Sequence, residues 1–393
     1  MRPVAFASVV WYDGHELRAE ARASAEDGIS PWARGIKRSE IEEDEVVDVR
    51  IERNRRFLSD LFAGPFRGHA LIMDPEPIAG DWPGDFACSE RPLQDWVPLA
   101  VGSYEAKLRR LEALDDDGVP DVRLGTGTHL FAAAFGCQVH VYEDSPAAAG
   151  PLVSSAEEAD RLVEPGPYSP PLERVFEYGH LLRKQVGPDV PIGVPDIQSP
   201  FDIAALIWNK QDMYLALYQN PDAVQRLVAK CQRLLSAFLI EFKAQFSECN
   251  LCHCPQAWAP AELGCWLSED EAGSMSVGMF ERFCLPSLAE LSDKFGGIFI
   301  HCCATADHQY PSFGKLPNLR GLNRVFQQPG PRPAIEAFAG RTVLMQAWTN
   351  EEDIHKMLDM ALPESRFLFN MPALPSEEAK GTYERLRARC PRS

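Results

Sequence analysis

The sequence predicts an α/β protein, a closed (β/α)8 barrel of the TIM type that follows an N-terminal extension. From residue 68 to the C-terminal region, about eight short strand-like runs alternate with helical segments. Strands and helices that alternate in this number favour a parallel sheet that closes on itself. No Gly-rich dinucleotide loop is present, and a doubly wound open sheet is the second choice. We expect the extension at residues 1–50 and the barrel domain at residues 51–390.

The extension is apolar only at its start. The segment PVAFASVVWY is followed by Asp13, His15, Glu16 and Arg18, where a signal peptide would need a neutral cleavage region. We therefore expect a first strand, or an arm that pairs with the edge of a sheet. Residues 20–50 are polar and acidic without a clear period and are expected to form a surface extension.

The barrel elements are predicted from apolar runs and helix signals. Short apolar stretches bounded by Gly or Pro are typical of buried strands. A long amphipathic helix is expected after Asn220, because Pro221 suits a first helical turn and apolar residues recur at helical spacing from Val224 to Phe242. The strand-like or apolar runs are residues 68–75, 128–136, 190–200, 250–258, 296–303, 319–328, 341–348 and 365–373.

The composition excludes several classes of function. The formal net charge of −18 repels a phosphate backbone, and no basic stripe offsets it, so no nucleic-acid binding is expected. No apolar run reaches the roughly 18 residues that a membrane span requires. Eleven cysteines in a chain of 393 residues do not form a disulfide scaffold. Reduced thiols, and with them a cytoplasmic location, are the expectation.

The segment GGIFIHCCATADH, residues 296–308, carries the strongest functional signal. Its apolar run from Ile298 to Ile300 predicts a buried strand that ends at His301 and Cys303. Alternate residues of a strand share a face, so these two side chains point the same way. An imidazole beside a thiolate is half of a tetrahedral zinc site. The alternative is a strand that ends in inert residues, since free Cys is commonly buried.

In a barrel of this type the last residues of the strands surround one opening, where ligands bind. Asp196 and His253 would stand there as candidates for acid–base catalysis. Trp, Gln, Asn and His dominate this ring, which suits a small neutral or aromatic molecule. Some of these residues are instead expected to cap strands and loops. The candidate substrate-binding residues are Gln198, Trp258, Gln346, Trp348 and Asn370, and Asp74 and Asn323 are expected at the same level.

Three segments resemble the uroporphyrinogen decarboxylase superfamily: residues 195–228, residues 274–291, and FIHCCATADHQYPSFGKLPNLRGLN at residues 299–323. The resemblance covers roughly residues 57–387 and is stronger after Val190. It implies a (β/α)8 barrel with its chemistry at the C-terminal ends of the strands. The third segment is similar to the zinc-dependent branch, whose corrinoid-protein methyltransferases end a strand with an H-x-C motif and activate a thiol with zinc.

The likeness to true uroporphyrinogen decarboxylases fails at the residues that bind their substrate. The chain has no R-Q-A-G-R motif, and residues 122–143 contain no Asp to hold the pyrrole nitrogens. Leu206 stands near the position of the family's Tyr, and FNMPALP replaces its late His turn. A substrate with several carboxylates needs paired cationic donors, so this activity is not expected.

The methyltransferase resemblance implies a metal site at His301 and Cys303, but the late Cys of those enzymes is missing from FLFNMPALP. Zinc enzymes of this kind need three protein ligands. We expect the run NLCHCPQAW to neighbour GGIFIHCC in the barrel, so that the following loop, residues 258–271, folds over His301. Cys265 or Glu271 would then complete the site, with Cys265 favoured as the softer ligand. His253 and His308 are further candidates.

Three functional hypotheses follow. The first is a methyl-group transferase that uses zinc at the barrel mouth, with a methylcorrinoid of a partner protein or a small methylated compound as the donor. The second is a metal-independent lyase or decarboxylase on a small acid, with acid–base catalysis by Asp196, His253 and His301. The third is a binding protein that keeps the barrel without the chemistry. Relatives include dimers, so a homodimer is an open alternative.

Overall fold

The computed structural model describes residues 43–64, 68–78, 84–142, 147–324, 326 and 329–392. The expected N-terminal strand or arm lies outside the described residues, as does most of the expected extension. Its last residues are helical, because α1 (Glu43–Ala63) begins before residue 50. Contacts divide the chain into residues 1–42 and 43–393, and every element below belongs to the second unit.

Nine parallel strands form two sheets within the described residues. The strands are β1 (His69–Met73), β2 (Val122–Arg123), β5 (Ile192–Gly193), β6 (Cys249–Asn250), β7 (Cys265–Ser268), β8 (Ile298–Cys302), β9 (Leu319–Arg324), β10 (Val343–Gln346) and β11 (Phe367–Met371). The larger sheet has the order β1-β11-β10-β9-β8-β7 and the smaller one the order β2-β5-β6. The short strands β3 (Val139–His140) and β4 (Ala148–Ala149) pair antiparallel apart from both.

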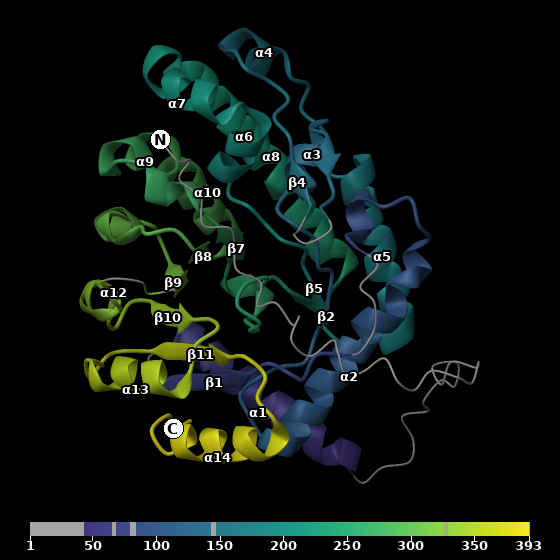
Figure 1. Cartoon of the computed structure of the whole chain (residues 1–393), viewed down its shortest axis with the longest axis vertical. Helices are drawn as coiled ribbons and strands as arrows, with labels where there is room; N and C mark the ends of the chain where they lie inside the picture. The colour runs from purple at the N-terminus through teal and green to yellow at the C-terminus, as the bar shows by residue number, and fades with distance from the viewer. Residues whose placement is uncertain are drawn as a thin grey trace. The chain divides into compact units, whose positions relative to one another are not determined.

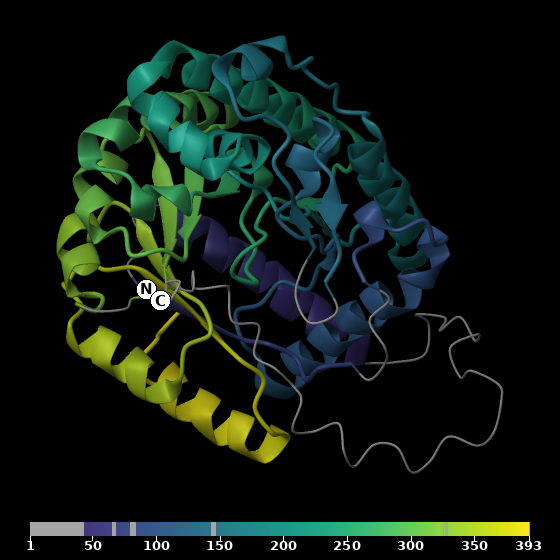
Figure 2. The same cartoon turned by 45° about the horizontal axis from the view of Figure 1, so that its top comes forward.

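Two contacts join the sheets into a closed barrel. A parallel bridge links Gln198, which follows β5, to Ser268 of β7. On the other side the backbone N–H of Asp117, shortly before β2, donates to the carbonyl of Leu71 in β1 at 3.0 Å. Figures 1 and 2 show the helices outside the strands. The short strands β6 and β7 both lie next to the β5 segment and share one of the eight strand positions, so the predicted (β/α)8 barrel is confirmed.

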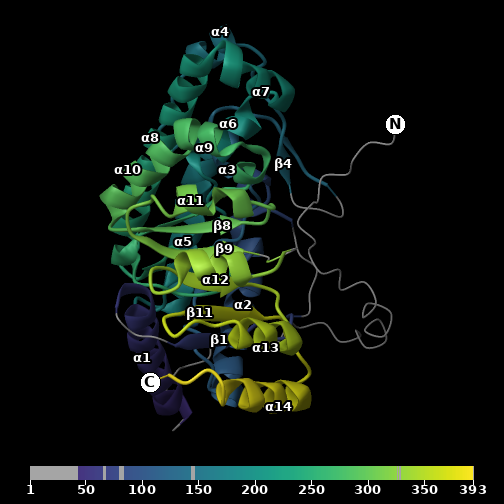
Figure 3. The ribbon, with the colours of Figure 1, turned by 90° about the vertical axis from the view of Figure 1, so that its left-hand side faces the viewer.

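The helices that surround the strands alternate with them along the chain. In Figure 3, α14 lies next to α13 at one end of the molecule, and α1 lies across the ends of the strands. The helices after α1 are α2 (Val97–Leu114), α3 (Leu130–Ala134), α4 (Ala156–Arg161), α5 (Pro170–Val186), α6 (Pro200–Ile207), α7 (Lys210–Gln219), α8 (Pro221–Gln245), α9 (Val277–Phe283), α10 (Leu285–Phe295), α11 (Tyr310–Phe313), α12 (Arg332–Phe338), α13 (Glu351–Asp359) and α14 (Ser376–Arg387). None of the helices within the described residues combines the length and the apolar character needed to cross a bilayer.

Helix α8 confirms the periodicity argument, since the apolar residues that recur from Val224 to Phe242 are buried along one face. The apolar run 128–136 behaves differently from a strand and forms α3. The strand of this part of the barrel is β2, a few residues before that run. It has only two residues and therefore leaves little periodic signal in the sequence.

Strand side chains alternate between the barrel interior and the surrounding helices. Ile72, Trp266, Phe299, Met345 and Leu368 belong to an interior cluster that also includes apolar residues of α1. Their strand neighbours, such as Leu71, Leu267 and Ile300, pack in a separate cluster with the outer helices. Parity along each strand therefore decides which residues can reach a ligand inside the barrel.

Helix α1 covers the N-terminal ends of the strands. Arg366, just before β11, donates to the carbonyls of Leu61 at 2.8 Å and Gly64 at 3.1 Å. Arg55 pairs with Glu248, just before β6, at 3.0 Å. These contacts cover the bottom of the barrel, so we expect a ligand at the C-terminal ends of the strands.

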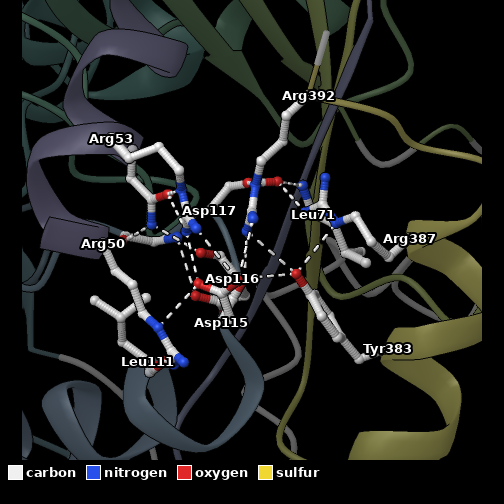
Figure 4. A network of polar contacts seen from close by, with 12 residues as sticks. Arg50, Arg53, Leu71, Leu111, Asp115, Asp116, Asp117, Tyr383, Arg387 and Arg392 are labelled. Atoms are coloured by element: carbon white, nitrogen blue, oxygen red, sulfur yellow. Dashed lines mark hydrogen bonds and ion pairs between the residues drawn. The ribbon is translucent and has the colours of Figure 1, made fainter. Parts of the chain in front are cut away.

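Three consecutive aspartates complete the join between β1 and β2 (Figure 4). The Asp117 carboxylate accepts from the N–H of Leu71 at 2.7 Å, and the Asp116 carboxylate accepts from the N–H of Met73 at 2.9 Å. Side-chain carboxylates thus bind strand N–H groups that a neighbouring strand would otherwise bind. Arg387 and Arg392 pair with Asp117, so the C-terminal helix is attached at the same point.

Candidate metal and active site

Three neighbouring strands bring polar side chains to one level at the C-terminal end of the barrel. Ser268 of β7 pairs with His301 of β8, and His301 pairs with Asn323 of β9. Two residues before them along the three strands stand Trp266, Phe299 and Gly321, which all lie at the barrel interior. Residues two apart share a face, so the side chains of Ser268, His301 and Asn323 also face inward. The apolar interior therefore ends in a polar layer at this level.

The orientation of the His301 ring is determined by Asn323. The Asn323 side-chain amide donates to the carbonyl of Met345 at 2.9 Å, which turns its oxygen toward His301. That oxygen accepts from Nδ1 of His301. Nε2 is then left to face the Cys303 sulfur at 2.9 Å. A histidine whose Nδ1–H is held by a carbonyl oxygen presents Nε2 as a metal ligand.

Asp270 supplies a third possible ligand. The ligand atoms of Asp270, His301 and Cys303 all lie within 4.8 Å of one another. The Asp270 carboxylate accepts from the backbone N–H of Cys303 at 2.6 Å, which keeps it beside the sulfur. The buried carboxylate of Asp202 in α6 holds the backbone N–H of Asp270 at 2.6 Å. Carboxylate, imidazole and thiolate are all zinc ligands, so the donor set fits this metal.

Cys254 is a second thiol beside the imidazole. It lies 3.8 Å from the Asn323 oxygen that holds His301. Burial alone would lower the pKa of His301, but negative charge on Cys254 and then on Cys303 raises it well above the usual value. Without a metal, the sulfur atoms beside the ring therefore favour the protonated form of His301.

Asp196 and His253 come to the same site, as the sequence predicts. His253 Nε2 lies 2.9 Å from the Ser268 hydroxyl and 3.8 Å from the Asp196 carboxylate. Gln198 donates to Asp196 at 2.6 Å. Burial raises the pKa of Asp196 to about 6. Burial, and then the charges of His301 and Arg123, lower the pKa of His253 well below its usual value.

A cation that the sequence analysis leaves out also faces this site. Arg123 ends β2 and alternates with the outward-facing Val122, so it points into the barrel. It donates to the Cys252 carbonyl at 3.3 Å, and its charge lowers the pKa of Asp74 and Asp196 against the larger effect of burial. Asn370 donates to Asp74 at 2.9 Å across β11 and β1.

The structure does not bring Cys265 or Glu271 to the His301–Cys303 pair. Cys265 begins β7 and pairs with Ile298, which lies three residues before His301. Its thiol packs in the cluster between the strands and the outer helices. Glu271 turns toward α7, where Lys210 and Tyr214 bind it. His308 points to the carbonyl of Met275. The expected loop at 258–271 contains β7, which pairs with β8, whereas β6 pairs with β5.

Trp258 lies at the opposite end of the barrel from the site. The chain turns back after Cys254, so that Trp258 packs with α1 residues and under the Arg55 guanidinium at 5.4 Å. Gln346 shares the outward face of Leu344 rather than the inward face of Met345. Trp348 follows β10 and is half exposed. Of the candidate substrate-binding residues, Gln198 is the one in contact with Asp196.

Asp270 could have been found from alternation. Trp266, Ser268 and Asp270 share one parity, whereas Glu269 and Glu271 share the other. The run CWLSEDE thus indicates Asp270 once Cys265–Ser268 is recognised as a strand that runs beside the H-x-C strand. Cys254 and Arg123 have no comparable signal, because β6 and β2 are each only two residues long.

Comparisons with known proteins agree with this architecture. The family described as "Uroporphyrinogen decarboxylase (URO-D)" matches residues 109–322, more than half of the chain. A solved structure of a methyltransferase from Methanosarcina mazei has 16% sequence identity and a TM-score of 0.57, over 85% of this chain and 98% of that chain. This likeness shows the fold.

A second solved structure, the apo form of the homocysteine methyltransferase MmuM from Escherichia coli, gives a TM-score of only 0.21. It has 11% identity over 44% of this chain and 87% of that chain. No curated protein matches the chain.

Proposed function

Because this chain belongs to the uroporphyrinogen decarboxylase family, we propose that it is a methyl-group transferase with a metal held by Asp270, His301 and Cys303. A methylcorrinoid or a small methylated compound is the proposed donor, and a small thiol the acceptor. The proposal rests above all on one observation: the ligand atoms of Asp270, His301 and Cys303 lie within 4.8 Å of one another. Because Nδ1 of His301 is already bound to Asn323, Nε2 is the ring nitrogen that can bind a metal.

Asp270, His301 and Cys303 would hold the metal and would leave room on it for a substrate thiol. When zinc is bound there, it lowers the pKa of a coordinated thiol, so that the thiol is a nucleophilic thiolate at neutral pH. Asn323 keeps the His301 ring in the ligand orientation, and Asp202 keeps the Asp270 segment beside Cys303. Asp196 lies 3.8 Å from His253, and we propose that this carboxylate accepts the proton that the thiol releases.

Metal removal tests this proposal. The reduced protein, supplied with methylcobalamin and a panel of small thiols, should form thioethers. Activity should disappear after chelation and return with Zn²⁺, because without the metal a free thiol near pKa 8.5 is mostly protonated at pH 7. Thioether formation is measured by mass spectrometry.

The matched controls are two adjacent cysteines. Cys303→Ala should abolish the zinc-dependent activity, whereas Cys302→Ala should keep it, because Cys302 is buried on the other face of β8. Thioether formation by fully chelated protein, or by the Cys303→Ala variant, would show that the metal proposal is wrong.

One observation favours a second candidate, a metal-independent decarboxylase of a small acid. Asp196 has a pKa raised to about 6 by burial and stands near the neutral His253. The inward-facing Arg123 offers a guanidinium for a carboxylate. A protonated Asp196 could then donate a proton to the carbon from which CO₂ departs.

The pH dependence of CO₂ release tests this candidate. Asp196 as general acid is active when protonated, so kcat/KM should fall as the pH rises through about 6. Asp196→Asn should remove this dependence and lower the rate by about 10²–10⁴-fold. Chelation and Cys303→Ala should have no effect. A rate that responds to chelation but not to Asp196→Asn would instead favour methyl transfer.

A further inference from the structure

A second group of metal-ligand side chains lies in the loops that follow β1 and β2. The ligand atoms of Asp85, Cys88 and His129 all lie within 4.8 Å of one another. None of these residues belongs to the site built around His301. We propose that Asp85, Cys88 and His129 form a second binding site, for a divalent ion of the zinc class. This inference does not depend on the proposed methyl transfer.

His129 gives the strongest reason for a ligand. Its side chain is 1% exposed, and neither ring nitrogen makes a hydrogen bond of normal geometry, although the backbone of Ala147 lies close to the ring. Buried polar atoms in native proteins are almost always satisfied, and each exception needs an explanation. Nε2 lies 3.8 Å from the Asp85 carboxylate, too far for a hydrogen bond but suitable for two ligands of one ion. A bound cation would satisfy Nε2.

The backbone holds the Asp85 carboxylate in place. One oxygen accepts from the N–H of Ala87 at 2.9 Å and the other from the N–H of Gly127 at 2.7 Å. Gly127 lies two residues before His129, so this contact joins the two loops that supply the ligands. Cys88 ends the single turn Phe86–Cys88 that Asp85 caps, and its sulfur lies 3.7 Å from the Asp85 carbonyl.

The donor set indicates the class of ion. A thiolate and an imidazole select zinc, cobalt or a related transition metal over Mg²⁺ or Ca²⁺, which prefer oxygen ligands. Three protein ligands leave one position for water or a small ligand. Cys88 is partly exposed, so an ion can reach the site from solvent.

The site would attach the β1 loop to the β2 loop at the mouth of the barrel. Thr126, next to Gly127, accepts a hydrogen bond from the backbone N–H of Asp196 at 3.2 Å. An ion bound by Asp85 and His129 would therefore stabilise the loop that supports Asp196. We expect bound zinc to raise Tm, because an ion that binds only the folded protein stabilises it.

Metal stoichiometry in a variant without the first site tests the proposal. The full-length His301→Ala, Cys303→Ala double variant, reduced and loaded with Co²⁺, should still bind about one ion per chain and show thiolate-to-cobalt absorption. Adding Cys88→Ser should remove that absorption, and adding His129→Ala should lower the affinity at least about tenfold. Adding Cys137→Ala, a buried thiol eight residues after His129 and outside the site, should change neither.

Circular dichroism verifies that each variant is folded, and the partly exposed position of Cys88 makes Cys88→Ser the safer variant. The proposal is wrong if the folded double variant binds no ion, or if its cobalt–thiolate absorption survives Cys88→Ser. If instead the site at Asp270, His301 and Cys303 binds no metal, the wild-type protein and the double variant should both bind one ion per chain. The measured stoichiometry therefore distinguishes failure of this proposal from failure of the proposed function.

Discussion

Asp117→Ala should lower the free energy of unfolding by about 3–5 kcal/mol, the cost of breaking a buried ion pair from one side. Asp117 is fully buried and pairs with Arg387 and Arg392. It also accepts from the N–H of Leu71, where β1 meets the segment before β2. Alanine would remove one buried carboxylate partner from both guanidinium groups, which keep Asp115, Tyr383 and Cys390 as acceptors, and would leave the N–H of Leu71 without its side-chain acceptor. Urea unfolding measures the change.

A surface pair of the same residue types provides the control. Asp359 pairs with Arg389 at 2.6 Å, but its side chain is 69% exposed. Asp359→Ala should cost about 0–1 kcal/mol, because water competes for exposed ion pairs. Equal losses in the two variants would show that the Asp117 network does not hold the barrel closed.

His301→Ala should lower kcat/KM for methyl transfer by at least about 10³-fold, because the metal at such a site contributes several kcal/mol. His301 is the ligand whose orientation the structure determines most fully, through Asn323. The first-site metal should be lost in the same variant. Asn323→Ala should give an intermediate result, with metal affinity lowered by about 10–100-fold.

His308→Ala is the matched control for His301→Ala. His308 lies in the same sequence motif but contacts the carbonyl of Met275 and takes no part in the site. It should keep both the metal and the rate. A His301→Ala variant with normal metal content and rate, or a His308→Ala variant that loses both, would contradict the assignment of the ligands.

Several features of this site follow from local sequence alone. His301 and Cys303 face the same way because residues two apart in a strand share a face. Asp196 and His253 could be placed at the mouth because each follows a strand-like run, and parallel strands end at the same side of a barrel. The helix after Asn220 could also be predicted from local sequence. Apolar residues recur at helical spacing along its 25 residues, and this gives a strong signal.

The residue pattern thus predicts the barrel, the side of the barrel where chemistry is expected, and the His301–Cys303 pair. Which residue lies beside that pair depends on how distant strands meet in the fold. Asp270 reaches it because β7 pairs with β8 in a register that puts Ser268 beside His301. Cys265 is excluded because the same register keeps it three residues lower and on the outer face. The register between two strands depends on contacts between segments that are distant in the sequence. It therefore cannot be predicted from the order of residues along one strand.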